Sequence, residues 1–215
     1  MSIHEEIEKK REKMKGGHPL GGYAAWFGVI FAAIFIALTI SVFLVSSIKV
    51  IGSSMTDTLQ DGDYLFMIKV GRPQIGDVVV LNVPSVSTYP LIKRVIGVEG
   101  DTIYSENQTI IREFTDNQGR KIKQIILDEA YVSQASKDKN THYNQDFHCV
   151  VGKDQIFVLG DNRWNSNDGS RFGPQPIKNV EGIVPQWIID SKKAIKAYFD
   201  FIGKIFPVRE AGQEN

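Results

Sequence analysis

Hydrophobic and polar residues are distributed unevenly along the 215-residue chain, which has one long uncharged run near its start. No charged residue occurs from Tyr23 to Ile48. A transmembrane helix needs about 20 apolar residues, whereas the apolar core of a cleaved signal peptide has only about 7–15. The run therefore predicts one transmembrane anchor over residues 23–48, preceded by an N-terminal tail over residues 1–22.

Basic residues before this run predict its orientation. Residues 9–15 read KKREKMK and carry five basic side chains. Lysine and arginine are enriched on the cytoplasmic side of membrane helices. We therefore expect a single-pass protein of the cell membrane, in contact with the lipid bilayer, whose N-terminus is cytoplasmic and whose remaining chain is extracytoplasmic.

Beyond residue 48 the apolar residues alternate with polar ones or form short clusters. Gly-Asp pairs interrupt these clusters at four places, and both residue types favour tight turns. Short strands separated by turns predict a mainly β fold, an antiparallel sheet or barrel, in a domain over residues 49–190. The polar stretch over residues 115–148 is expected to be partly an insertion or loop. The strand candidates are YLFMIKV, DVVVLNV, LIKRVIGV, TIIREF, KQIILD and QIFVLG.

The last segment, residues 191–215, predicts an amphipathic helix and a C-terminal tail. Four lysines within residues 192–204 argue against a second transmembrane helix. Two placements of the amphipathic helix remain open: it packs on the domain, or it lies on the outer surface of the membrane. The apolar residues at helical spacing are Ile195, Tyr198, Phe199, Ile202 and Phe206.

Composition narrows the possible functions. The 25 basic and 25 acidic residues give no net charge, so nothing indicates a partner such as nucleic acid. The single cysteine, Cys149, excludes an internal disulfide and every multi-cysteine metal site. We expect it to be a small buried thiol. The sequence gives no reason to invoke a metal ion or an organic cofactor.

Two adjacent serines, Ser53 and Ser54, follow the uncharged run closely. Serine is a poor nucleophile until a neighbouring base removes its proton. Two of the four histidines precede the run and would lie on its other side, and two lie in the polar stretch. A Ser-His-Asp triad is therefore not favoured. The four histidines are His4, His18, His142 and His148.

A lysine can replace histidine as the base if it is held neutral. The ordinary lysine pKa near 10.4 must then fall by roughly three units, about 4 kcal/mol, which burial can supply. Lys93 and Arg94 both lie in an apolar strand candidate, and arginine is effectively never deprotonated. Lys93 is therefore the candidate base. Lys69, in another strand candidate, is the alternative.

Four motifs, in order after the uncharged run, resemble those of bacterial type I signal peptidases, in particular the single-span form typical of Gram-positive bacteria. They cover most of residues 50–185. The motifs are Ser54-Met55 with Thr58-Leu59 and Gly62-Asp63; Gly76-Asp77-Val78-Val79; Lys93-Arg94-Val95-Ile96-Gly97 with Gly100-Asp101; and Gly160-Asp161-Asn162-Arg163 with Asn165-Ser166, Asp168 and Ser170-Arg171.

This resemblance implies a serine–lysine dyad. Ser54 would be the nucleophile, Lys93 the general base, and Ser166 the hydroxyl that orients the lysine amine. The backbone N–H of Ser54 would stabilise the oxyanion. Ser53 is expected to be a hydrogen-bonded structural serine on the opposite face of a strand.

The resemblance also implies roles around the dyad. Met55 would shape the substrate pocket, and Asp161 and Arg171 would brace the site through an ion pair. The implied activity is removal of N-terminal signal peptides from secretory preproteins. These substrates carry small residues at the first and third positions before the cut.

Three departures from the family pattern keep other functions open. Asp57 stands where proline is usual and is expected to point to water, Gly169 is an additional residue, and Gly52 replaces a hydroxyl donor of some members. One alternative is a catalytically impaired or specialised relative that acts as a membrane scaffold in surface-protein or pilus assembly. Self-cleaving repressor-type proteases lack such an anchor, and an extracellular binding module would not need the four motifs.

Overall fold

The structure is a computed structural model in which two units are distinguished, Met1–Phe43 and Leu44–Asn215. The residues that it describes are 3–15, 19–107, 109–126, 131–132, 147–202 and 209–211. Part of the polar stretch, with His142, lies outside these residues, as does His18. The N-terminal part of the chain is helical and the larger unit is mainly β.

Helices α1 (Ile3–Lys15) and α2 (Pro19–Leu44) make up the N-terminal part. Among the described helices, α2 contains the one stretch, Ala25–Leu44, that is long and apolar enough to cross a membrane. Its large apolar side chains are exposed around the helix, which is typical of a span that needs a lipid environment. The helix ends four residues earlier than expected, because residues 45–48 form the first part of a strand that pairs with the domain.

The larger unit is built on an eight-stranded sheet in the order β10-β9-β4-β3-β11-β2-β1-β12. Neighbouring strands are antiparallel except β1 and β12, which are parallel. The mainly β, antiparallel fold predicted from the alternating pattern is therefore confirmed. The strands are β1 (Val45–Val50), β2 (Tyr64–Ile68), β3 (Val78–Leu81), β4 (Leu91–Val98), β9 (Gln155–Leu159), β10 (Gln175–Pro176), β11 (Val180–Val184) and β12 (Arg209–Ala211).

A second sheet of four strands extends from the first, in the order β7-β6-β5-β8. Strand β4 leads into it through the turn at Gly100-Asp101, where the buried Asp101 carboxylate pairs with Arg112 at 2.8 Å. Part of the polar stretch is thus regular strand rather than loop. The strands are β5 (Thr102–Glu106), β6 (Thr109–Thr115), β7 (Lys121–Ile125) and β8 (His148–Val150).

Strand β4 lies at the centre of the core, and its residues are buried on both faces from Leu91 to Gly97. One face contributes Leu91 and Val95 to a hydrophobic cluster with β3 and β9. The other face contributes Ile92 to a cluster with the segment after β1. A polar side chain in the middle of β4 is therefore shielded from water on either face.

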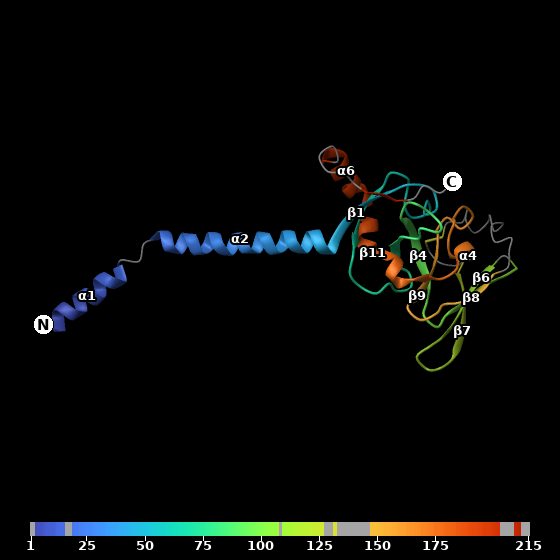
Figure 1. Cartoon of the computed structure of the whole chain (residues 1–215), viewed down its shortest axis with the longest axis horizontal. Helices are drawn as coiled ribbons and strands as arrows, with labels where there is room; N and C mark the ends of the chain where they lie inside the picture. The colour runs from blue at the N-terminus through green and yellow to red at the C-terminus, as the bar shows by residue number, and fades with distance from the viewer. Residues whose placement is uncertain are drawn as a thin grey trace. The chain divides into compact units, whose positions relative to one another are not determined.

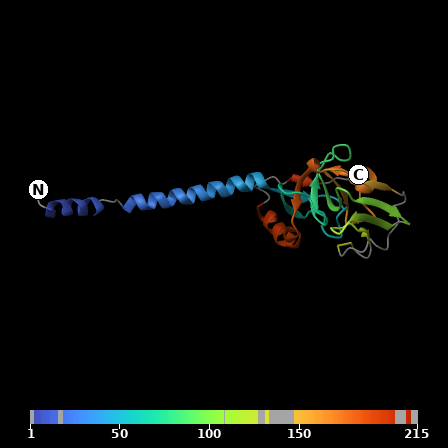
Figure 2. The same cartoon turned by 90° about the horizontal axis from the view of Figure 1, so that it is seen from below.

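Short helices cover the ends of the large sheet. Helix α6 packs on β2 through Phe199, whose ring lies 4.9 Å from that of Tyr64 and 5.3 Å from that of Phe66. Figures 1 and 2 agree that α6 and the four-stranded sheet lie at opposite ends of this unit. The predicted amphipathic helix is therefore present and packs on the domain. The helices are α4 (Gly169–Phe172), the 3₁₀ turn η2 (Ile177–Asn179), α5 (Gln186–Asp190) and α6 (Lys192–Ile202).

Candidate active site

Ser54 lies in a compact turn after β1 rather than in a strand, which corrects the expectation of a regular strand. Gly52 has φ of +97°, a conformation that glycine adopts without strain, and its N–H donates to Asp61 Oδ1 at 2.9 Å. The turn is closed by hydrogen bonds from the Thr56 N–H to the Ser53 carbonyl and from the Leu59 N–H to the Met55 carbonyl. Ser54 is therefore held half-buried on a rigid turn.

Lys93 lies in β4 and is fully buried, with 0% of its surface exposed. Complete burial of a lysine is rare in folded proteins. On one side it pairs with Val79 of β3. On the other side Arg94 pairs with Leu159, the last residue of β9, and extending this antiparallel register by one residue places Gly160 opposite Lys93. Lys69, the alternative base, is exposed at the surface.

Both predicted serines, Ser54 and Ser166, lie against Gly160, the residue opposite Lys93. A Cβ atom added at Gly160 would stand 2.5 Å from the carbonyl oxygen of Ser54 and closer still to Oγ of Ser166. Directly opposite residues in an antiparallel pair project to the same face of the sheet. Ser54 and Ser166 thus lie on the face of the sheet toward which Lys93 projects, around a residue that has to lack a side chain.

Ser166 has a buried hydroxyl that makes no hydrogen bond within the described part of the chain. Most buried polar atoms are hydrogen-bonded, so an unpaired one calls for a reason. Asn162 Oδ1 is the other such atom within the described residues. Both belong to the loop that follows β9, which carries the fourth motif.

This loop holds the serine turn through hydrogen bonds that the sequence did not predict. The backbone N–H of Asn162 donates to the Ser54 carbonyl at 3.0 Å, and its side-chain amide donates to the Ser53 carbonyl at 2.9 Å. Asn165 Nδ2 donates to Ser53 Oγ at 2.8 Å, in accord with a structural Ser53. Both asparagines belong to the fourth motif, so this motif was the feature of the sequence that could have identified them.

Asp168 closes the same loop. Its carboxylate accepts from the Gly160 N–H at 2.9 Å and from the Ser170 N–H and hydroxyl at 3.1 and 2.8 Å, which caps α4. Gly169, the additional residue, begins α4 against β9, where a Cβ would stand 2.6 Å from the Val158 carbonyl. The additional residue is thus part of a compact, capped turn.

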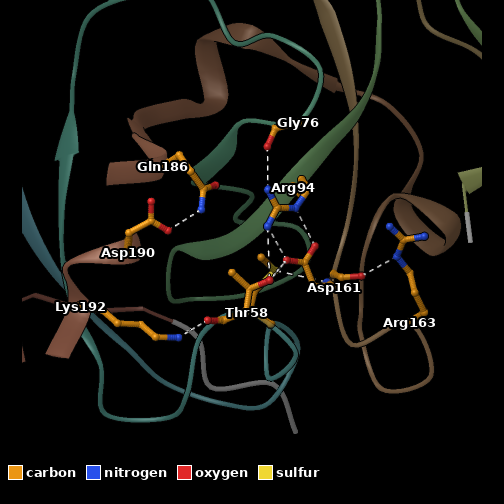
Figure 3. Close-up of polar contacts among 10 residues, drawn as sticks. Thr58, Gly76, Arg94, Asp161, Arg163, Gln186, Asp190 and Lys192 are labelled. Carbon is orange, nitrogen blue, oxygen red and sulfur yellow. Dashed lines mark hydrogen bonds and ion pairs between the residues drawn. The ribbon is translucent and has the colours of Figure 1, made fainter. Parts of the chain in front are cut away.

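A buried ion pair braces the site, with a partner different from the one expected. Asp161 is fully buried and receives two hydrogen bonds from Arg94, at 2.9 and 2.6 Å. Figure 3 shows the guanidinium between this carboxylate and the Gly76 carbonyl, which accepts a third bond at 2.8 Å. Arg171, expected to brace the site, is exposed. Register explains the difference, because Arg94 lies on the strand beside Asp161.

The ion pair extends to the serine turn. Thr58 Oγ1 donates to Asp161 Oδ2 at 2.5 Å, and the Asp161 N–H lies 3.4 Å from Sδ of Met55. Lys192, at the start of α6, donates to the Thr58 carbonyl and lies 4.0 Å from the Asp63 carboxylate (Figure 3 shows the first contact). The turn is therefore attached to β4, to the loop after β9 and to α6.

A narrow recess lies beside Ser54. Residues 50–55 form one wall and Leu91 and Ile92, which precede Lys93, form the other. Met55 belongs to this lining and is buried in the core behind it, while Asp57 is partly exposed. Within the described residues, no group of three or more histidine, cysteine, aspartate or glutamate side chains could hold a metal ion.

The chain is similar in sequence to known signal peptidases. Residues 23–188 match the family model described as signal peptidase, peptidase S26. A signal peptidase I of Bacillus amyloliquefaciens is 37% identical over 156 residues, 70% of this chain and 76% of that protein. Signal peptidase I T of Bacillus subtilis (strain 168) is 36% identical over 159 residues, again 70% of this chain and 76% of that protein.

A solved structure is also similar. The crystal structure of a signal peptidase I from Enterococcus faecalis V583 is 28% identical, with a TM-score of 0.41. The similarity covers 54% of this chain and 99% of that chain. The family match includes every motif residue discussed above but ends at residue 188, before α6 begins.

Proposed function

Because the chain belongs to the signal peptidase family, peptidase S26, and is therefore an enzyme that removes signal peptides, we propose that Ser54 and Lys93 carry out its reaction as nucleophile and general base. The observation that carries this proposal is the surroundings of Gly160. The Ser54 carbonyl and the Ser166 hydroxyl both lie against it, on the face toward which the fully buried Lys93 projects.

Acylation uses the buried amine of Lys93 as the base, and an amine accepts a proton only in its neutral form. As Ser54 Oγ attacks the scissile carbonyl, Lys93 Nζ takes the serine proton and a tetrahedral oxyanion forms. The C–N bond then breaks, and Lys93 gives the proton to the leaving amine of the mature protein. The signal peptide remains bound as an ester of Ser54.

Deacylation reverses the proton transfers. A water molecule attacks the ester carbonyl while Lys93 Nζ accepts its proton. The ester C–O bond breaks, Ser54 Oγ recovers the proton from Lys93, and the signal peptide leaves with a free carboxylate. Ser166, whose buried hydroxyl lacks a partner within the described residues, is suited to orient the lysine amine.

Oxyanion stabilisation falls to the turn that carries Ser54. No hydrogen bond within the described residues uses the N–H of Ser54, so this donor is available to the substrate. A donor fixed in advance stabilises developing charge without reorganisation. The bonds from Asn162 to Ser53 and Ser54 hold that donor in place.

The recess and the apolar helix support a proposal for the substrate and for the location of the enzyme. The narrow recess between residues 50–55 and Leu91-Ile92 suits small side chains, as expected for preproteins with small residues at the first and third positions before the cut. Helix α2 would anchor the enzyme in the cell membrane, with its N-terminus cytoplasmic and the β domain outside. Asp161 and Met55 would support the turn, and Arg171 has no role in this mechanism.

The test compares two adjacent serines in the full chain reconstituted in lipid. A preprotein with alanine at the first and third positions before the cut is the substrate, and the product is identified by intact mass. Ser54→Ala and Lys93→Met should abolish cleavage, whereas Ser53→Ala and Lys69→Met should retain it. Cleavage that survives Ser54→Ala would assign a different nucleophile. A folded but inactive unmodified chain, beside an active control peptidase, would favour the scaffold function.

A further inference from the structure

Helix α6 carries apolar side chains on two neighbouring faces. Ile195 and Phe199 face the domain, and Phe199 is 5% exposed. On the neighbouring face, Tyr198 is 54% exposed and Phe201 is 85% exposed. At 3.6 residues per turn, Ala194, Tyr198 and Phe201 form one stripe that is directed away from the sheet. A helix whose apolar residues extend around it is expected to be covered on both sides.

One lysine of the helix, Lys193, is exposed. Lys192 and Lys196 lie on the side away from the stripe, half-buried beside the turn at residues 58–63. An exposed basic residue on the polar face, next to an aromatic stripe, is typical of helices that lie in the interface of an anionic bilayer. The charge of Lys193 therefore complements anionic lipid headgroups.

Within the larger unit, α6 lies close to the strand that follows Leu44. Leu44, the last residue of α2, belongs to the same unit as β1, β2 and α6, and its carbonyl accepts from the Lys69 N–H at 2.9 Å. Phe66, on which Phe199 packs, is paired with Ser47. Ser47 follows Leu44 by three residues, a path of roughly 10 Å along a strand.

We propose that α6 is an interfacial lipid-binding helix, with Tyr198 and Phe201 at the boundary of headgroups and acyl chains and Lys193 at anionic headgroups. This inference rests on the proposed membrane insertion of α2. It concerns a segment beyond the family match, which ends at residue 188. Lys192 of the same helix contacts Thr58, which follows Ser54 by four residues in the turn. Lipid contact at α6 is therefore linked to the serine turn through Lys192.

Single labels in the full chain test the proposal. Cys149, the only cysteine, is replaced by alanine, and an environment-sensitive fluorophore is attached at Phe201→Cys, Asp200→Cys or Val150→Cys. Val150 is a matched control, since it is 60% exposed and lies in the four-stranded sheet at the other end of the unit (Figures 1 and 2). Ile36→Cys in the middle of α2 reports membrane insertion of the anchor. Each protein is placed in nanodiscs that hold one copy, with anionic lipids that carry a nitroxide near the headgroup or along the acyl chain.

The proposal expects strong nitroxide quenching at positions 36 and 201, weaker quenching at 200 and none at 150. Quenching at 201 should fall when neutral lipids replace anionic ones. Quenching at 36 but not at 201 would overturn the lipid-binding role of α6 and leave the anchor intact. Absence of quenching at 36 would overturn the anchor, and with it this inference. Protection of position 201 without nitroxide quenching would indicate coverage by protein and would also reject it.

Discussion

The backbone N–H of Asn162 donates a hydrogen bond of 3.0 Å to the carbonyl oxygen of Ser54, and the side-chain amide of Asn162 donates to the preceding carbonyl, that of Ser53. Two adjacent peptide groups are thus held by one residue of a different loop. The position of the Ser54 N–H and hydroxyl relative to β4 depends on this attachment.

Asn162→Ala should therefore lower kcat more than it changes KM. The Ser53 carbonyl keeps its hydrogen bonds from Thr56, so loss of the amide should cost about 0.5–1.5 kcal/mol, which corresponds to roughly a two- to tenfold loss of rate. Steady-state kinetics with a preprotein substrate measures both constants. Asn165→Ala is the matched control, because it removes only an exposed bond to Ser53 Oγ and should cost less than about threefold. Equal losses in the two variants would contradict a special role for Asn162.

The buried pair of Arg94 and Asp161 predicts a combined loss of stability and activity. Arg94→Met leaves a fully buried carboxylate without its cation, which should lower the free energy of unfolding by about 3–5 kcal/mol. Arg112→Met provides the control, since it breaks a second buried pair, with Asp101, in the four-stranded sheet. Thermal unfolding and cleavage per folded molecule are measured for both. Only Arg94→Met should reduce cleavage per folded molecule, and an equal reduction in Arg112→Met would refute the link to the site.

We predict that the site does not tolerate even one methyl group at Gly160. The Cβ of Gly160→Ala would stand 2.5 Å from the Ser54 carbonyl and would meet the Ser166 hydroxyl, so the turn or the loop has to move. We expect cleavage to fall by at least about 100-fold, as misplacement of reacting groups by about 1 Å does. Circular dichroism and thermal unfolding establish whether the variant is folded. A folded Gly160→Ala variant with normal kcat would show that Ser54 and Ser166 do not need their present positions.

The sequence predicted the fold class well because most of the sheet follows a simple alternating pattern. In β2, Leu65 and Met67 are buried, whereas their neighbours in the strand are partly exposed. Such alternation with turn residues between strands is a local property, readable from one sequence. Strand β4 is different, since both of its faces are buried and alternation could not show whether Lys93 or Arg94 faced the serines.

The predictions that were wrong, or that were missing, concern features that depend on tertiary contacts. Residues 45–48 are apolar enough to continue a membrane helix, and only their pairing with β2 makes them a strand. The partner of Asp161 is set by the neighbouring strand, which brings Arg94 and not Arg171 to it. Asn162 reaches Ser54 from a distant loop, a contact that no local pattern encodes. The motifs supplied the candidate residues, but the contacts among these residues required the structure.

We predict that helix α6 supports catalysis through Lys192. Its ammonium donates to the Thr58 carbonyl in the serine turn and lies 4.0 Å from the Asp63 carboxylate. Lys192→Met keeps most of the length of the side chain and removes both interactions, so kcat should fall by roughly two- to tenfold, the equivalent of about 0.5–1.5 kcal/mol. Lys193→Met, at the exposed neighbouring position, should leave kcat in detergent unchanged. Identical kinetics for Lys192→Met and the unmodified enzyme would separate α6 from the active site.

Cys149 provides a pH-dependent report on the folded domain. Partial burial of its side chain, in strand β8, raises the pKa of its thiol to about 11, above the ordinary value of about 8.5. The thiolate is the form that reacts with iodoacetamide, so at pH 8.5 the folded protein should be alkylated about 100-fold more slowly than the urea-unfolded chain. The sign is fixed by the direction of the shift: the folded thiol keeps its proton over the range in which the unfolded thiol loses it, and the rate should keep rising up to about pH 11. Alkylation followed by mass spectrometry across pH 7–10 gives the profile. A plateau near pH 9 in the folded protein would mean that the thiol is in contact with water rather than packed against the buried cluster that includes Ile103 and Phe157.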